Sequence, residues 1–257
     1  MMIDEDNFIN HWLKQEYTKV KSCQLYCVNE KLDKENVKNF LAKKVAEHIT
    51  TPDLLKALKD LNKEKLAIEI ENYVPTKDNI RKGDFGEILT VENLVQWQGY
   101  EKSFKLRHKS IINRSEEGHD VFLLKINSDE KFLIGVAETK THMKYQKITF
   151  QNAHNEFKEK LEKDHQFKDA LSYMKKELAK DFPKVVEKLA IYSQSIDLNE
   201  FPRENWIFLI SSNKPKNVKN HIENDDDLIK SMNFVSIHIN QLEEFIDEIW
   251  GMCPNAI

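Results

Sequence analysis

The hydrophobic pattern is clearest between residues 77 and 97, where apolar positions recur with the period of a helix. Glu87, Val91 and Leu94 lie at i, i+4 and i+7 and therefore share one face of this helix. Gly83 and Gly86 lack side chains, so the first half of the helix can approach a sheet closely. We expect this helix to pack on a sheet formed by the residues that follow.

Strand-like and helix-like patterns then alternate to the end of the chain. We expect strands at 103–107, 121–126, 132–137, 206–210 and 235–239, and helices at 150–178, from Pro183 onward, and at 242–249. The polar segments 113–118 and 127–131 have the composition of loops, and the second suits a β-hairpin. This order predicts an α/β fold, a mixed sheet covered by helices.

The first 76 residues form a separate part of the pattern. An alternating strand is expected at 22–28, followed by helices at 33–49 and from Pro52 onward, where proline suits the first helical turn. Pro75 then interrupts the helical pattern, because proline lacks an N–H donor and restricts the preceding residue. We therefore divide the chain into a small N-terminal α+β module, 1–76, and a main domain, 77–257.

Composition indicates an ordered globular protein. The chain has 257 residues, of which 40% are hydrophobic, with only 6 Gly and 6 Pro. Apolar runs fall short of the roughly 18 residues that a membrane span needs, and the first residues are acidic where a secretory signal is basic. We expect a cytoplasmic protein without a membrane segment. The spacing of Cys23, Cys27 and Cys253 does not suggest a zinc site.

The net charge of −4 argues against a chain coated with basic residues for non-specific DNA binding, but the charge is unevenly distributed. Acidic residues gather at 223–227, whereas one stretch is rich in cations: Lys102, Lys105, Arg107, Lys109, Arg114, Lys140, Lys144 and Lys147. This basic stretch is either ordinary solvated surface or a surface that contacts phosphate. Composition alone leaves both interpretations open.

Two carboxylates are expected to meet across the predicted hairpin. If strands 121–126 and 132–137 pair around the loop 127–131, Asp120 lies opposite Glu138. Directly opposed residues have Cβ atoms about 5 Å apart, so both carboxylates could bind one small cation. Two such charges about 4 Å apart repel by about 4 kcal/mol at an effective dielectric near 20, so they need a cation or a shared proton. A hard divalent ion, Mg²⁺ or alternatively Mn²⁺, fits this requirement.

Lys140 follows Glu138 by two residues and therefore lies on the same face of the strand. A metal site can bind a phosphate and acidify a water, and a lysine beside it can orient the nucleophile or offset negative charge. This combination is suited to phosphodiester hydrolysis. The sequence leaves open whether Lys140 acts as a base or electrostatically. Glu87, on the preceding helix, is the candidate third carboxylate, which could complete the metal shell or hold a second ion.

The pattern acidic-x-Lys is weak by itself, because it occurs at 129–131, 138–140 and 156–158. The first copy lies in the expected turn, and the third in a helix, where positions two apart diverge. Glu138-Thr139-Lys140 ends an apolar strand and has an acidic residue at the matching end of its partner strand. The alternative is an ordinary ion pair at an exposed strand end.

Three segments together, Gly83-Asp84-Phe85-Gly86-Glu87, Gly118-His119-Asp120 and Glu138-Thr139-Lys140, resemble the PD-(D/E)xK nuclease superfamily. His119 stands where that superfamily commonly has proline. The resemblance implies a restriction-endonuclease-like fold, catalytic roles for Glu87, Asp120, Glu138 and Lys140, and a metal shell drawn from the three acids. We expect His142, Lys144 and Lys147, which follow the strand, to line the path of DNA.

The layout of the whole chain is also similar to the HamA family, the nuclease subunits of the Hachiman anti-phage defence system. That resemblance implies a DNA endonuclease controlled by a HamB-like helicase partner. The sequence contains no Gly-x-x-x-x-Gly-Lys-Ser/Thr motif, which is consistent with an ATP-driven partner on another chain. The N-terminal module is a candidate docking surface for it. The alternatives are a non-catalytic DNA-binding or regulatory subunit on the same fold, and a restriction or repair nuclease with another partner.

Overall fold

The computed structural model describes residues 7–31, 34–50, 62–104, 120–126, 131–162, 164–180, 182–194, 202–214, 217–229 and 231–257. The helices are α1 (Phe8–Trp12), α2 (Lys38–Ile49), α4 (Lys63–Glu71), α5 (Asp78–Gln98), α6 (Lys147–Glu162), α7 (Asp164–Leu178), α8 (Pro183–Gln194), α9 (Val218–Glu223) and α10 (Leu242–Met252), with short 3₁₀ turns η2 (Lys34–Asn36) and η4 (Cys253–Asn255). The strands are β1 (Leu13–Val20), β2 (Cys23–Glu30), β3 (Lys102–Phe104), β4 (Val121–Ile126), β5 (Phe132–His142), β6 (Arg203–Ser211) and β7 (Met232–His238).

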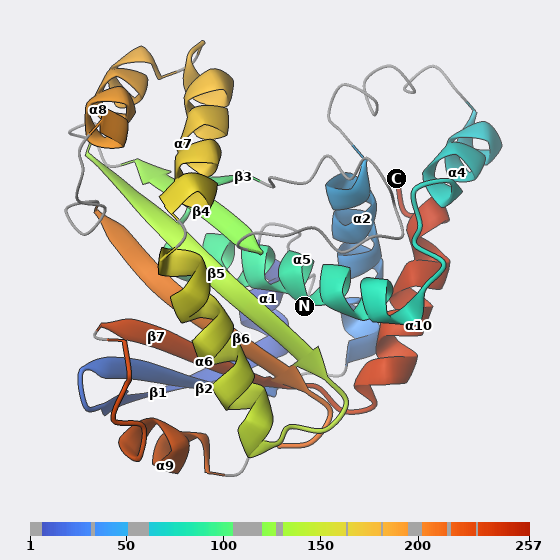
Figure 1. Cartoon of the computed structure of the whole chain (residues 1–257). Helices are drawn as coiled ribbons and strands as arrows, with labels where there is room; N and C mark the ends of the chain where they lie inside the picture. Colours follow the sequence, from blue (N-terminus) through green and yellow to red (C-terminus); the bar gives the residue numbers. More distant parts are fainter. Residues whose placement is uncertain are drawn as a thin grey trace.

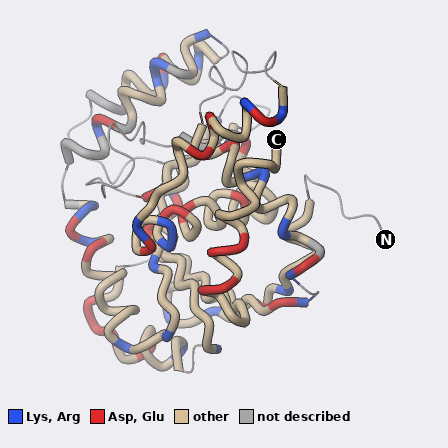
Figure 2. The backbone as a smooth tube through the Cα atoms, turned by 90° about the vertical axis from the view of Figure 1, so that its right-hand side faces the viewer, with Lys and Arg blue, Asp and Glu red and all other residues tan. Residues whose placement is uncertain are grey.

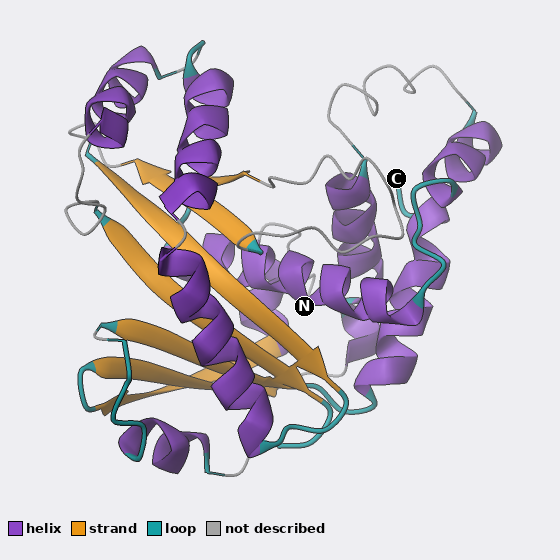
Figure 3. Ribbon diagram, in the orientation of Figure 1, coloured by secondary structure: helices purple, strands orange, loops and turns teal. Residues whose placement is uncertain are grey.

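All seven strands belong to one mixed sheet, in the order β1-β2-β7-β6-β5-β4-β3. The four central strands, β2, β7, β6 and β5, run parallel, whereas β1 at one edge and β4 and β3 at the other are antiparallel to their neighbours. Helices lie on both faces of the sheet, with α6 across the front in Figure 1 and α5 behind it (Figures 1 and 3). The α/β fold expected from the sequence is confirmed, and it is consistent with the restriction-endonuclease-like arrangement.

The two faces of the sheet carry separate hydrophobic cores, because side chains alternate along each strand. Helices α1, α2, α5 and α10 cover one face, where Phe85, Val121 and Phe208 are buried. Helices α6, α7, α8 and α9 cover the other, where Phe122, Val136 and Phe157 are buried. A residue's place in the strand therefore decides which set of helices it meets.

The register of the central hairpin agrees with the sequence expectation. Val121 pairs with Ala137 and Ile126 with Phe132, so the next pair outward is Asp120 and Glu138. The turn at 127–130 lies outside the described residues, but the ladder on either side fixes the pairing. A shift by one residue would have moved Asp120 to the opposite face.

Most elements after residue 76 also match the expectation. The helix expected at 77–97 is α5, which ends at Gly99 in the left-handed conformation (φ +68°) that glycine adopts without strain. The helical stretch expected at 150–178 is instead two helices, α6 and α7. The described residues do not include the loop expected at 113–118. They include only the beginning of the strand expected at 103–107, which is covered by β3.

The N-terminal segment contributes more strand than its pattern predicts. β1 was not anticipated, because its side chains are mostly exposed and its sequence is largely polar. β2 hydrogen-bonds to β7, and Leu41 and Val45 of α2 share a core with α5 and α10. The division at residue 76 stays a prediction about chain organisation, but strands on both sides of it form one sheet and helices from both sides share one core.

Figure 2 shows Lys and Arg interspersed with Asp and Glu along most of the described chain. Within the described residues, no helix combines the length and the apolar character needed to span a bilayer. The three cysteines are free thiols, and Cys23 and Cys253 are buried. The expectation that the cysteines do not form a zinc site stays a prediction. The expected cytoplasmic location also stays a prediction.

Candidate active site

The carboxyl-terminal half of β5 carries the two residues on which the site is built. Thr139 faces α5, because its hydroxyl hydrogen-bonds to that of Thr90 at 2.9 Å. The alternate residues Glu138 and Lys140 therefore face α6 on the other side of the sheet. Glu138 is fully buried, whereas about a fifth of the Lys140 side chain is exposed. β5 thus places a carboxylate inside the protein and an ammonium group closer to its surface.

Asp120, immediately before β4, lies at the same end of the hairpin. Its Oδ2 accepts a hydrogen bond from the backbone N–H of Thr139 at 2.7 Å, which fixes the carboxylate beside β5. Its Oδ1 lies 3.5 Å from Nζ of Lys160, the same ammonium group that donates to Glu138 Oε2 at 2.6 Å. The two carboxylates therefore converge on a common point, as the hairpin register predicted.

Lys140 completes a chain of alternating charges. Its Nζ lies 3.1 Å from Glu138 Oε1 and also hydrogen-bonds to Glu156 of α6. Glu156 and Lys160 are one helical turn apart, so α6 presents both charges to β5. The contacts join five charged residues into one cluster: Glu138 and Lys140 of β5, Asp120 before β4, and Glu156 and Lys160 of α6.

The electrostatics of this cluster are dominated by Glu138. Its burial, and then the nearby charge of Asp120, raise the pKa of the Glu138 carboxyl to about 7, although Lys160 and Lys140 oppose the rise. Burial acts to lower the pKa of the Lys140 ammonium, but Glu138, Glu156 and Asp120 outweigh it and raise that pKa above its ordinary value. Burial is therefore the largest influence on the Glu138 carboxyl, and the two lysines offset it only in part.

A divalent cation fits this donor set. Glu138 Oε1 is buried without a hydrogen-bond partner, because its contact with Lys140 lacks hydrogen-bond geometry. Among the described residues, no group of three or more His, Cys, Asp or Glu side chains is arranged to hold a metal. Two carboxylates are nevertheless sufficient for Mg²⁺, which commonly binds one or two of them and completes its shell with water and substrate phosphate.

Glu87 lies on α5, the helix that packs on the face opposite Glu138 and Lys140, and it is buried. The contact between Thr90 and Thr139 brings α5 against β5, but the described residues Glu87, Asp120 and Glu138 do not form a group of three acids arranged to hold a metal. Its role as a third metal ligand stays a prediction.

The residues expected to follow DNA lie beyond the end of the cluster. His142 ends β5, Lys144 lies on the connection into α6, and Lys147 is the first residue of α6; all three are exposed. Burial, and then the charge of Lys140, lower the pKa of His142. His119 lies outside the described residues. His154 is buried and lies 3.3 Å from Asp225, apart from the cluster.

Two residues of the cluster were missed by sequence reasoning. Glu156 was considered only as part of an acidic-x-Lys pattern in a helix, and Lys160 was not singled out. Their i, i+4 spacing beside the apolar positions Phe150, Ala153 and Phe157 was the available signal. That spacing is common on helices, so it does not identify the strand that the two charges meet.

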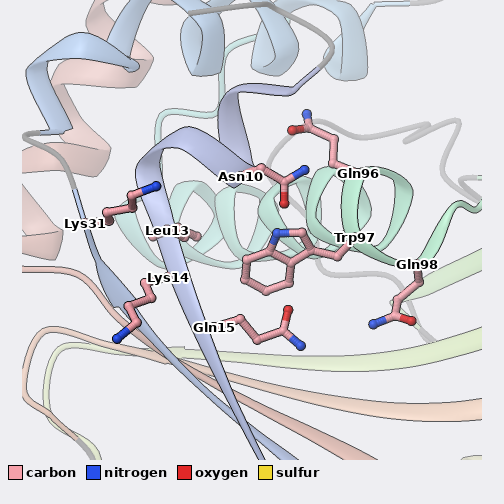
Figure 4. Close-up of a pocket in the computed structure, with 8 residues that line it drawn as sticks. All are labelled: Asn10, Leu13, Lys14, Gln15, Lys31, Gln96, Trp97 and Gln98. Carbon is pink, nitrogen blue, oxygen red and sulfur yellow. The ribbon is translucent and has the colours of Figure 1, made fainter.

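A separate polar pocket of about 670 Å³ lies beside Trp97, between the N-terminal segment and the end of α5 (Figure 4). Its lining consists of Asn10, Leu13, Lys14, Gln15, Lys31, Gln96, Trp97 and Gln98. Trp97 is only partly buried, unlike Trp12, Trp206 and Trp250, which are core residues. None of the residues predicted for catalysis lines this pocket.

The chain matches a known protein family over nearly its whole length. The sequence model of a protein family described as HamA matches residues 6–250 of the 257. The matched region includes the whole cluster described above and the N-terminal strands. No curated protein matches the chain.

Proposed function

Because the chain belongs to the HamA family and is therefore a Hachiman-associated antiviral defence protein, we propose that it is a metal-dependent DNA endonuclease. We further propose that it is the effector of the defence complex and is controlled by a HamB-like helicase. The observation that carries the nuclease proposal is the convergence of Asp120 and Glu138 on one point beside Lys140.

Asp120 and Glu138 are the proposed ligands of Mg²⁺, and Mn²⁺ could replace it. When bound, such an ion supplies Lewis acidity toward a phosphate oxygen and promotes ionisation of water. Glu138 is buried and Asp120 is held by the Thr139 N–H, so neither carboxylate needs to be repositioned over a long distance. Fixed ligands of this kind reduce the reorganisation needed during the reaction.

Lys140 is the proposed electrostatic residue of the site. Glu138 and Glu156 hold its ammonium group at the outer side of the buried carboxylate, where it can orient a water and offset charge on a phosphate. This arrangement favours an electrostatic role over that of a general base, because both neighbours stabilise the positive form. Glu87 is retained as the proposed third acidic residue.

DNA is proposed to approach from the exposed end of β5. His142, Lys144 and Lys147 lie there, from the last residue of β5 to the first residue of α6. Cations in this position can bind backbone phosphates without reading sequence. Replacing all three should weaken DNA binding and reduce its dependence on salt concentration, because fewer counterions are then released.

Control by a helicase partner is proposed from family membership, with the N-terminal segment 1–76 as the docking surface. β1 forms one edge of the sheet, and most of its side chains are exposed. An edge strand offers unpaired backbone groups to another chain. This surface lies at the opposite edge of the sheet from β4 and β3.

The direct test is plasmid cleavage by the isolated chain and by the chain with its helicase, in Mg²⁺ and in EDTA. Glu138→Gln and Lys140→Met should abolish cleavage. Glu243→Gln is the control and should leave cleavage unchanged, because it removes a carboxylate of α10 that pairs with Lys82 of α5. Unchanged cleavage in both site variants would refute the assignment. DNA binding without any cleavage under all these conditions would favour the non-catalytic alternative.

A further inference from the structure

Lys160 lies between the two carboxylates proposed to hold the metal. Its Nζ is 2.6 Å from Glu138 Oε2 and 3.5 Å from Asp120 Oδ1. Lys140 instead contacts Glu138 through the other oxygen, Oε1. Of these two lysines, Lys160 is the one that bridges both acids, so its ammonium group occupies the point on which they converge.

We propose that Lys160 is an internal cation that competes with the divalent metal for Asp120 and Glu138 and must leave when the metal binds. This inference rests on the proposed metal site. Mg²⁺ requires oxygen ligands at about 2.0–2.1 Å, and its ligands surround it closely. An ammonium group already shared by both carboxylates takes up the same oxygens, and like charges repel at this distance.

Lys160 is also placed so that it can leave. It lies in the last turn of α6, and its side chain is about one-fifth exposed. Lysine has a long flexible stem and a strongly hydrated ammonium group, so its Nζ can move to solvent without unfolding the helix. Asp120 and Glu138 belong to the sheet and can stay in place while the side chain rotates away.

The metal-free protein needs this charge. Without Lys160, Lys140 would be the cation left in contact with the buried Glu138 among the described residues, and Lys140 is shared with Glu156. Removing one partner of a buried ion pair leaves an uncompensated charge and destabilises the fold. The proposal therefore predicts opposite effects of one substitution: a less stable metal-free protein and a tighter metal site.

The test compares Lys160→Met with Lys158→Met in the full chain. Both remove a lysine from α6, but Lys158 pairs with Asp227 away from the cluster. Mn²⁺ titration by calorimetry should show that Lys160→Met binds Mn²⁺ about tenfold more tightly than the unmodified chain, as expected when a competing charged hydrogen bond is removed. Thermal melts should show a lower midpoint in EDTA and a larger rise on adding Mn²⁺. Lys158→Met should leave both measurements unchanged.

Two further variants make the outcomes distinct. Lys160→Arg keeps the positive charge and should therefore bind Mn²⁺ no more tightly than the unmodified chain. Lys160→Gln removes the charge but keeps a hydrogen-bond donor. If Lys160→Met fails to fold, Lys160→Gln should show the tighter Mn²⁺ binding and the lower melting temperature in EDTA. Equal or weaker Mn²⁺ binding after removal of the charge would overturn the role of Lys160 while leaving the metal site intact. If the unmodified chain does not bind Mn²⁺, or binds it equally well after Glu138→Gln, the metal site itself is wrong and this proposal fails with it.

Discussion

Gly86 provides a sharp test of how α5 positions β5, the strand that carries Glu138 and Lys140. A Cβ atom placed on Gly86 would lie 2.0 Å from Thr141 Oγ1 and 3.0 Å from Thr139 Cγ2, both on β5. Rotation of Thr141 could relieve the first contact. The second requires a shift of Thr139, whose hydroxyl is hydrogen-bonded to Thr90. Gly86→Ala should therefore push α5 and β5 apart.

Gly83, on the same helix and nearly one turn earlier, is the matched control. It is exposed, and a Cβ placed there meets nothing within 4 Å. Alanine is favoured over glycine inside a helix by about 1 kcal/mol, and this gain applies to both positions. Overpacking typically costs about 1–3 kcal/mol. Because the helix term cancels, Gly86→Ala should be less stable than Gly83→Ala by about 1–3 kcal/mol.

Urea unfolding followed by circular dichroism measures this difference directly. Gly83→Ala should be at least as stable as the unmodified chain, and Gly86→Ala should be less stable than Gly83→Ala. If Gly86→Ala unfolds at the same or a higher urea concentration than Gly83→Ala, α5 does not pack on β5 as described. The close approach that fixes the strand carrying Glu138 would then be wrong.

Three further predictions follow from individual contacts. Asp120→Asn should lower Mn²⁺ affinity in a calorimetric titration but leave the melting temperature nearly unchanged, because the amide oxygen can still accept the Thr139 N–H; an unchanged affinity would exclude Asp120 as a ligand. Thr90→Val should destabilise the chain by about 1–3 kcal/mol in urea unfolding, because it leaves the buried Thr139 hydroxyl unpaired, while Thr90→Ser should cost less; equal losses would show that the hydrogen bond is unimportant. Burial lowers the pKa of His154 below its ordinary value of 6.5, against the opposing effect of Asp225. The contribution of the neutral His154 to stability is therefore full above pH 6.5 and decreases as the pH falls below 6.5. Urea unfolding should show that the free energy of unfolding decreases less between pH 7.5 and pH 5.5 in His154→Gln than in the unmodified chain. An equal decrease would assign the pH dependence to other groups.

The central hairpin was predictable because several sequence signals agree there. Two apolar segments flank a polar loop, and the alternation in each strand permits one register that keeps its hydrophobic residues inside. That register places Asp120 beside Glu138 without knowledge of any other element. Lys140 follows from the period of two along β5.

Other elements were harder to predict, for identifiable reasons. β1 is a mostly exposed edge strand, so it lacks the apolar alternation that marks a half-buried strand. The separation of α6 from α7 was also missed, because apolar residues continue with a helical period from Phe150 to Leu178. Periodicity reports which face of a segment is buried and does not report where one helix gives way to the next.

Lys160 shows where the reasoning from sequence ends. The hairpin is local, so its register can be argued from residues close together in the chain, whereas the meeting of α6 with β5 depends on how a whole helix crosses the sheet. The sequence indicates that Asp120 and Glu138 need a cation or a shared proton between them, since two carboxylates at this distance repel. The cation expected from the sequence was a divalent metal, and Lys160 was not considered. In the structure the protein supplies a cation of its own from α6. The same electrostatic need can thus be met by a lysine in the resting protein and, as proposed, by Mg²⁺ in the working one, and the exchange between them is what the Lys160 variants measure.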